Sequence, residues 1–218
     1  VQTADPETYA ALIADILENE YDAIALQEVN QLSSGTSVNE PEGYLPTQNE
    51  IPIKSDNFAY FLVKSLAEKG LSYHWSWVPC HQGYFRFDEG VAILSKAPIQ
   101  SVEQVQLSVV NDFENIHTRR ALALETEAAA FVSVHLSWWK TEEENPFLLE
   151  WTSVETAVKK LRGIKPIYVM GDVNNPADVR NEGYDLITNA GWQDAYAVAA
   201  TRIGSATVPP AIDGWVGN

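Results

Sequence analysis

The sequence has one cysteine and no long apolar segment, and each absence excludes a class of protein. Cys80 is the only thiol among 218 residues, so no intramolecular disulfide can form, and cysteine usage leaves the compartment open. No run approaches the roughly 18 consecutive apolar residues of a membrane-spanning helix, so we expect no transmembrane segment. The first residues do not have the pattern of a signal peptide, so we expect none. We therefore expect a cytoplasmic protein, with a secreted one as the alternative.

Basic residues are scarce. The chain has 14 Lys and Arg against 30 Asp and Glu, which gives a formal charge of −16. Nonspecific binding of nucleic acid relies on clustered cations that neutralise phosphates. The composition therefore predicts no strong basic nucleic-acid surface, and bound divalent cations would offset part of the negative field. Nothing in the sequence sets the oligomeric state.

Several common active-site motifs are also missing. The sequence has no serine nucleophile elbow, phosphate-cradling glycine loop, paired-cysteine zinc motif or dinucleotide fingerprint. Cys80 has no evident catalytic partner, and a buried or incidental thiol is the simpler interpretation. Hard-cation chemistry with a histidine as acid or base is the mechanism that remains.

The chain does contain a mixture of helix and strand patterns. Apolar residues at helical spacing, with capping residues at the ends, predict helices from Asp5-Pro6 onward, over 56–69 and from Pro146 to Gly163. Short apolar or alternating runs predict strands at 23–28, 73–78, 89–95, 99–107, 118–126, 130–137 and 166–172. The stretches 29–55 and 83–88 are predicted to be loop and turn, and a polar tail runs from Thr201. Consecutive strands with short connections favour antiparallel hairpins, so we expect an α/β fold with two sheets packed together and helices outside.

Ionisable or amide side chains end four of the predicted strands. They are Glu28, Glu89, His135, and Asp172 with Asn174. In an extended backbone Asp172 and Asn174 face the same side, and a carboxylate beside an amide suits a hard cation, a phosphate or an attacking water. Each residue alone also has an ordinary structural explanation, as a solvated strand end, a helix cap or a satisfied core histidine. Trp138 and Trp139 lie three and four residues after His135, and this favours a groove wall.

In order along the chain, these residues resemble a known family. The motifs are Leu-Gln-Glu-Val at 26–29, Asp-Glu-Gly-Val-Ala-Ile-Leu-Ser at 88–95, Thr-Arg-Arg-Ala at 118–121, Val-His-Leu-Ser-Trp-Trp at 134–139 and Gly-Asp-Val-Asn-Asn-Pro at 171–176. Over nearly its whole length the chain resembles the endonuclease/exonuclease/phosphatase superfamily, which includes pancreatic-type deoxyribonuclease, bacterial sphingomyelinases and inositol phosphatases. It looks closest to bacterial members whose histidine motif ends in paired tryptophans.

The resemblance implies a four-layer α/β sandwich and a metal-dependent phosphoester hydrolase. By motif match, Glu28 would bind Mg²⁺, or alternatively Mn²⁺, and His135 would contact the phosphate. Glu89 would orient His135, and Asp172 would orient or deprotonate the attacking water. Such an enzyme acts as a phosphodiesterase, nuclease or phosphatase.

The resemblance also implies how the substrate is held. Asn174 would hold the phosphate or the metal, and either Arg119 or Arg120 would face the phosphate. The substrate classes are a small molecule, a lipid head group or a nucleic acid. The acidic charge and the Trp138–Trp139 pair favour a small or lipid-like substrate.

Some motifs of the family are absent. No strand with a Thr-x-Asn type motif precedes the first helix, and no Ile-Asp-Tyr-Ile strand or final Ser-Asp-His follows Trp215. Asp213 is expected to lie in a loop, and Val173 replaces the usual Phe. We therefore expect residues 1–218 to form one domain of this family that is incomplete at both ends, with exposed apolar strand edges. The alternative is a non-catalytic binding or scaffold domain that retains the fold and has lost part of the site.

Overall fold

The structure, a computed structural model, describes residues 5–48, 51–141, 144–161, 165–204, 207, 211–212 and 215–216. These residues fall into two compact units, one up to Asn174 and one from Asn175 onward. In the part of the chain that the structure describes, no helix is long and apolar enough to cross a membrane.

The larger unit alternates helices and strands. Its helices are α1 (Pro6–Asn19), α2 (Phe58–Ala67) and α3 (Pro146–Leu161). Its strands are β1 (Ala23–Leu32), β2 (His74–Gly83), β3 (Phe87–Ser95), β4 (Ser101–Gln106), β5 (Arg120–Glu125), β6 (Ala130–His135) and β7 (Ile167–Asp172). The predicted cap at Asp5 forms, since its carboxylate accepts a hydrogen bond from the Thr8 N–H. Asn57 caps α2 through a hydrogen bond that its side chain accepts from the Tyr60 N–H. The helix stop expected at Gly163 lies outside the described residues.

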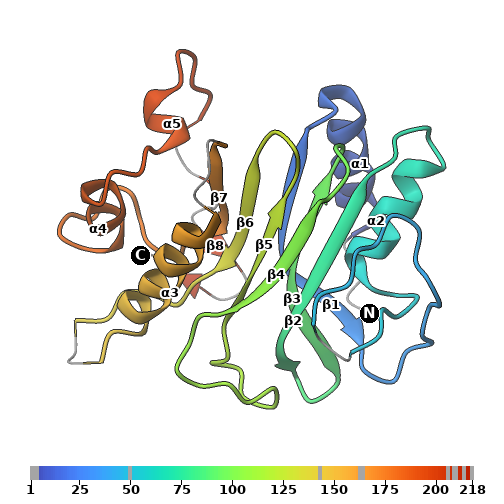
Figure 1. Cartoon of the computed structure of the whole chain (residues 1–218), viewed down its shortest axis with the longest axis horizontal. Coiled ribbons are helices and arrows are strands. Elements are labelled where there is room, and N and C mark those ends of the chain that lie inside the picture. The colour runs from blue at the N-terminus through green and yellow to red at the C-terminus, as the bar shows by residue number, and fades with distance from the viewer. Residues whose placement is uncertain are drawn as a thin grey trace. The chain divides into compact units, whose positions relative to one another are not determined.

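The strands build two sheets that pack between helices. One sheet has the order β1-β3-β2 and is antiparallel, and the other has the order β4-β5-β6-β7 with only β6 and β7 parallel. Figure 1 shows α1 and α2 beside the three-stranded sheet and α3 beside the four-stranded sheet. This is the predicted four-layer α/β sandwich.

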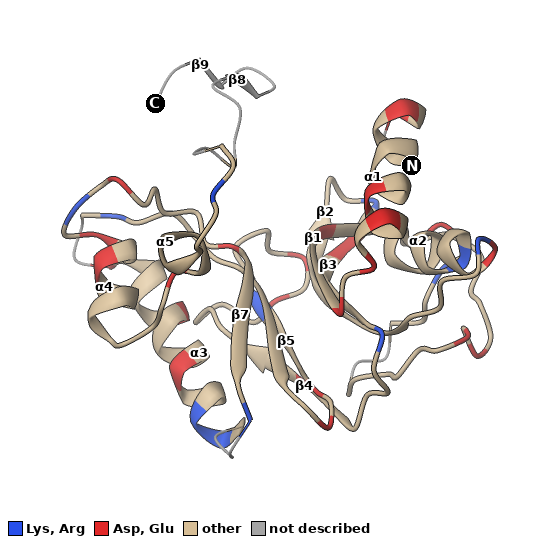
Figure 2. Cartoon of the chain, turned by 90° about the horizontal axis from the view of Figure 1, so that it is seen from above, with Lys and Arg blue, Asp and Glu red and all other residues tan. Residues whose placement is uncertain are grey.

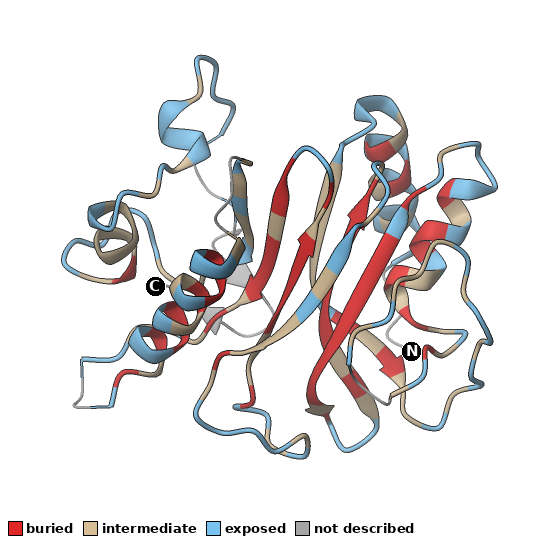
Figure 3. Ribbon diagram, in the orientation of Figure 1, coloured by how far each residue is buried: buried red, intermediate tan, exposed pale blue. Residues whose placement is uncertain are grey.

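Two apolar layers hold the sandwich together. Between the first sheet and helices α1 and α2, the fully buried residues include Ile16, Leu62, Trp75 and Trp77. Between the sheets, the buried residues are Val78, Cys80, Val91, Ile93, Leu122 and Leu124. Figure 3 shows this burial concentrated in the central strands. The indole nitrogens of Trp75 and Trp77 donate to backbone carbonyls, so these aromatic side chains of β2 belong to the core rather than to a binding surface.

Strand β1 is longer than predicted. Its register with β3 shifts between Leu26 and Val29, which leaves Gln27 and Glu28 in a β-bulge, and Glu28 adopts a left-handed backbone with φ of 52°. A bulge resets the alternation of side chains, so Val29 is fully buried and pairing continues to Leu32. The prediction of a loop from residue 29 was therefore wrong, because the extra residue masks the strand's period.

The hairpin between β2 and β3 is tighter than the predicted turn. Only residues 84–86 separate the strands. Tyr84 and Phe85 have positive φ values of 50° and 55°, and they are 83% and 91% exposed. Tight hairpin turns of this kind usually carry Asn or Gly, so two exposed aromatic side chains stand at a strained turn.

The outer strand β7 is poorly covered. Its apolar side chains are half-buried, and Tyr168 is 50% exposed and stacks on Phe131 of β6, whereas the middle of β5 is fully buried. Strand β7 is the outermost strand of this sheet among the described residues.

The smaller unit holds α4 (Gly183–Asn189) and α5 (Ala195–Val198) and the short strands β8 (Ala211–Ile212) and β9 (Trp215–Val216). The loop expected at Asp213 lies outside the described residues.

We expect Gly171→Ala to destabilise the protein by about 3 kcal/mol. Gly171 has φ of +129°, and a Cβ atom would lie 2.1 Å from the Val134 carbonyl oxygen of the neighbouring strand. Gly70→Ala is the matched control, because Gly70 also has a positive φ, of +89°, but open space around it, and should cost about 1 kcal/mol. Urea unfolding of the two variants measures the difference, and equal losses would contradict the clash.

Candidate functional site

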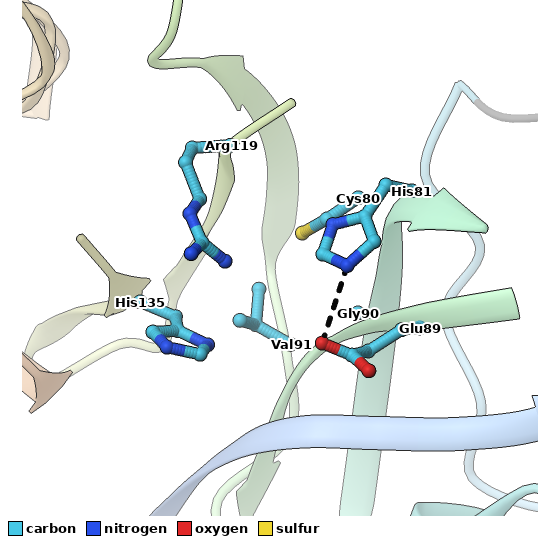
Figure 4. A pocket seen from close by; sticks show the side chains of 7 residues that line it. All are labelled: Cys80, His81, Glu89, Gly90, Val91, Arg119 and His135. Carbon is cyan, nitrogen blue, oxygen red and sulfur yellow. Dashed lines mark ion pairs between the residues drawn. The ribbon is translucent and has the colours of Figure 1, made fainter. Parts of the chain in front are cut away.

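Side chains from both sheets of the larger unit meet at a small cavity of about 10 Å³, lined by Cys80, His81, Glu89, Gly90, Val91, Arg119 and His135. In Figure 4 Arg119 extends between His135 on one side and the His81–Glu89 pair on the other. The cavity has room for about one water molecule. It therefore marks where polar groups converge, rather than a complete substrate cleft.

Three polar side chains form a row across the first sheet. Glu89 of β3 pairs in register with His81 of β2 and with Asn30 of β1, so all three project from the same face. His81 Nε2 lies 3.4 Å from Glu89 Oε1, and His81 Nδ1 lies 3.3 Å from the Thr118 carbonyl oxygen. A carbonyl only accepts hydrogen bonds, so Nδ1 carries a proton. Nε2 then faces the Glu89 carboxylate, which a protonated imidazole would meet as an ion pair.

The His81–Glu89 pair controls the charge of Glu89. Burial alone would raise the pKa of Glu89, but the hydrogen bond and charge of His81, with smaller effects of His135 and Arg119, outweigh it. The pKa of Glu89 is therefore lowered, and the carboxylate is ionised at neutral pH.

His81→Gln should lower the free energy of unfolding at pH 7 by about 2–3 kcal/mol, because it leaves a buried carboxylate without its cation. Because the pKa of Glu89 is lowered from 4.5, its contribution to stability is complete above about pH 4.5 and disappears as the pH falls through the lower folded-state pKa. Urea unfolding between pH 3 and 7 would test this, with the exposed His74→Gln as control. Parallel stability curves for His81→Gln and wild type would refute the coupling.

His135 and Asp172 end the two parallel strands of the second sheet. They are paired in register, and His135 Nε2 lies 3.8 Å from Asp172 Oδ2. Burial and the charge of Arg119 lower the pKa of His135, against the opposing effects of Asp172 and Glu89. The acid that contacts His135 is thus Asp172. The predicted Glu89–His135 pairing is not what the geometry shows, because Glu89 is held in its own sheet by His81.

The backbone turns sharply after Asp172. Asn174 has φ of 51°, its N–H donates to Asp172 Oδ1 at 2.8 Å, and its Nδ2 donates to the Leu136 carbonyl at 2.8 Å. The expectation of an extended strand through Asn174 is therefore wrong, because the aspartate side chain bonds to the backbone two residues on. The amide instead ties the end of β7 to the residue after His135.

Glu28, the residue expected to bind a metal, lies at the bulge of β1. Burial, with the charges of Glu89 and Asp172, raises the pKa of Glu28, and the charges of Arg119 and His81 oppose the rise. Two residues on, Asn30 Nδ2 donates to the Glu28 carbonyl at 2.9 Å, while the buried Asn30 Oδ1 has no hydrogen-bond partner among the described residues. Carboxylate and amide oxygens are ligands that Mg²⁺ prefers. The described residues contain no cluster of three or more His, Cys, Asp or Glu of metal-binding type, so water or substrate oxygens would complete the coordination.

The two candidate arginines point to different places. Arg120 donates to the Pro79 carbonyl, Gln106 Oε1 and Asn111 Oδ1, and these bonds account for its position. Arg119 lines the cavity, and its buried Nε has no hydrogen-bond partner in the described part of the chain. Of the two, Arg119 is the one available to a ligand in the cavity.

Cys80 is buried, as the sequence indicated, and burial raises its pKa to about 11. Two other polar residues at the site, His81 and Asn30, are not among the candidates that the sequence pattern indicates. His81 lies beyond the strand predicted at 73–78, and the longer β2 places it opposite Glu89. Asn30 was assigned to a loop because the bulge at Glu28 was not recognised.

The fold is a four-layer α/β sandwich whose candidate residues lie where the two sheets meet. The sequence profile of the Endonuclease/Exonuclease/phosphatase family matches residues 2–204. The chain belongs to this family, whose members hydrolyse phosphoesters.

Solved structures agree on the fold. An endonuclease/exonuclease/phosphatase family protein from Leptotrichia buccalis C-1013-b matches with a TM-score of 0.80 at 24% identity, over 97% of this chain and 76% of that one. ANGEL2, described as a 2′,3′-cyclic phosphatase, matches with a TM-score of 0.52 at 15% identity, over 83% of this chain and 46% of that chain. SmcL matches with a TM-score of 0.50 at 16% identity, over 83% and 60%, so this chain spans less than two thirds of either of these two proteins. No curated protein matches the sequence.

Proposed function

We propose that this protein is a divalent-cation-dependent phosphoester hydrolase whose active site comprises Glu28, Glu89, Arg119, His135 and Asp172. The observation that carries the proposal is the meeting of Glu89, Arg119 and His135, from separate elements, at one cavity, with Asp172 in contact with His135. Hydrolysis of a phosphoester needs an oriented water and positive charge facing the phosphoryl oxygens. These residue types supply both.

Each side chain has a role that follows from its surroundings. Arg119, whose buried Nε has no hydrogen-bond partner among the described residues, binds the phosphate, which a guanidinium can contact with two parallel hydrogen bonds. His135, whose pKa is lowered, is neutral at neutral pH and exchanges a proton with the reacting phosphate or water. Asp172 orients or deprotonates the attacking water. Glu89, kept ionised by His81, sets the electrostatic environment of His135.

Glu28 and Asn30 Oδ1 would hold the cation, Mg²⁺ or Mn²⁺. When bound, the cation supplies Lewis-acid charge to the phosphate oxygens. The same charge would offset the negative surroundings that raise the pKa of Glu28. Asn174, whose Nδ2 bonds to the Leu136 carbonyl, keeps the end of β7 in place and holds the phosphate or metal with its remaining oxygen.

The substrate class that we favour is a small or lipid-like phosphoester. Lys and Arg appear in Figure 2 as isolated segments rather than a continuous face, and the net charge is −16. Extended contact with a phosphate backbone needs the opposite distribution. The exposed aromatic tip at Tyr84 and Phe85 lies three and four residues beyond His81, which suits an apolar group attached to the phosphate.

The test is a substrate panel measured with Mg²⁺, with Mn²⁺ and with EDTA. We expect hydrolysis of bis(4-nitrophenyl) phosphate in the presence of either cation, and faster turnover of sphingomyelin in mixed micelles than of plasmid DNA. Arg119→Lys should raise KM more than it lowers kcat, because a lysine keeps the charge but cannot donate two parallel hydrogen bonds as a guanidinium does. Absence of turnover on phosphodiesters, phosphomonoesters and phospholipids alike would favour a scaffold domain instead.

A further inference from the structure

Helix α3 carries a buried acidic side chain that the proposed mechanism does not use. Glu150 is 1% exposed and lies on the buried face of α3 with Phe147, Trp151 and Val154. Burying a carboxylate costs several kcal/mol unless its oxygens are hydrogen-bonded. An apolar residue at this position would avoid that cost, so the partners of Glu150 are informative.

Both oxygens of Glu150 are bonded to the same residue. The Ser137 N–H donates to Oε2 and the Ser137 hydroxyl donates to Oε1, each at 2.7 Å. Burial raises the pKa of Glu150, while these bonds and the charge of Arg119 oppose the rise. Short hydrogen bonds to a carboxylate are among the stronger ones in proteins, and two of them fix Ser137 against α3.

Ser137 lies two residues after His135, and the residue between them is fixed as well. The Leu136 N–H donates to the Asp172 carbonyl at 2.9 Å, and the Leu136 carbonyl accepts from Asn174 Nδ2 at 2.8 Å. The chain leaving β6 is therefore held by β7 at Leu136 and by α3 at Ser137. These contacts limit the movement of the His135 backbone.

The two tryptophans after Ser137 diverge. Trp139 packs on Phe147 of α3, with ring centroids 5.8 Å apart, while Trp138 is 52% exposed. The Ser137–Glu150 contact thus lies just before two tryptophans, of which one packs on α3 and the other is exposed. Its loss would free the segment on the C-terminal side of His135.

We propose that Glu150 is a positioning residue that holds His135 in register with Asp172 by fixing Ser137. This inference rests on the proposed function of His135 for its catalytic consequence, but the contact itself can be tested without turnover. Glu150 does not line the cavity with His135 and Arg119, so it acts through the backbone and not on the substrate.

Four variants distinguish the effect of the Glu150 hydrogen bonds from the effect of its charge and from a general loss of stability. Glu150→Ala removes both bonds and should lower kcat about 10- to 100-fold with little change in KM, because small displacements of a reacting group are costly. Glu150→Gln should retain most of kcat, since the amide oxygen can accept the Ser137 N–H and the amide nitrogen can donate to Oγ. Ser137→Ala keeps the N–H bond and should lower kcat only a few-fold. Thr156→Ala, exposed on the same helix, should match wild type.

A spectroscopic readout separates this inference from the proposed function. The chain has four histidines, so the His135 imidazole signals can be assigned in NMR spectra by comparison with His135→Gln. We expect these signals to shift in Glu150→Ala and to stay in place in Glu150→Gln and Thr156→Ala. If wild type hydrolyses no phosphoester, the proposed function fails and the NMR comparison still decides the positioning role.

Two results would overturn the inference. One is a folded Glu150→Ala variant with wild-type kcat and unshifted His135 signals. The other is a Glu150→Gln variant as impaired as Glu150→Ala, which would assign the effect to the charge of Glu150. If Glu150→Ala does not fold, the pair Glu150→Gln and Ser137→Ala carries the same comparison.

Discussion

His135→Ala should lower kcat for phosphodiester hydrolysis by at least about a hundred-fold and by as much as ten-thousand-fold, the range that a positioned acid or base contributes. The side chain lies at the end of a buried strand, 3.8 Å from Asp172, and lines the same cavity as Arg119. Because burial and Arg119 lower its pKa from 6.5, the neutral form persists below pH 6.5. The acid limb of the pH–rate profile of wild type should therefore lie below that pH.

The control for this variant is His74→Ala. His74 begins β2 and is exposed, so its removal should leave kcat within about two-fold of wild type. A His135→Ala variant that keeps its fold and more than a tenth of the wild-type kcat would remove His135 from the mechanism.

Glu28→Gln should abolish saturable Mg²⁺ binding measured by calorimetry, and with it most of the activity. The substitution keeps the shape of the side chain but removes the charge that a hard cation requires. Burial, Glu89 and Asp172 raise the pKa of Glu28, and Mg²⁺ competes with the proton for this carboxylate. The number of protons that wild type releases on binding Mg²⁺ should therefore fall as the pH rises.

Asn30→Asp and Glu7→Gln complete the metal experiment. Asn30→Asp replaces an unpartnered buried oxygen with a charged one and should tighten Mg²⁺ binding, whereas Glu7, exposed in the first turn of α1, serves as a remote acidic control. Unchanged Mg²⁺ affinity in Glu28→Gln would place the cation elsewhere.

Much of the fold could be predicted because its signals are local. The cap at Asp5, the apolar stripe of α3 and the strand that ends at Asp172 appear in the structure at the predicted places. Each depends on residues close together in the sequence, where spacing and capping preferences act directly. The four-layer arrangement followed from the resemblance.

The pairings within the site could not be predicted in the same way. Glu89 binds His81 because a register shift between Pro79 and His81 places the imidazole opposite the carboxylate. Glu28 and Asn30 depend on a bulge that the apolar pattern conceals. Glu150 and Ser137 come from a helix and the end of a strand, 13 residues apart. Such contacts depend on tertiary packing and register, which side-chain periodicity does not encode.

The most direct test of the account is the rate at which the wild-type protein hydrolyses bis(4-nitrophenyl) phosphate as Mg²⁺ is titrated. We expect the rate to rise with Mg²⁺ to a plateau, to return to the uncatalysed level with EDTA, and to recover when Mg²⁺ is restored in excess. A rate equal to the uncatalysed reaction at saturating Mg²⁺, or an enzymatic rate that EDTA leaves unchanged, would contradict it.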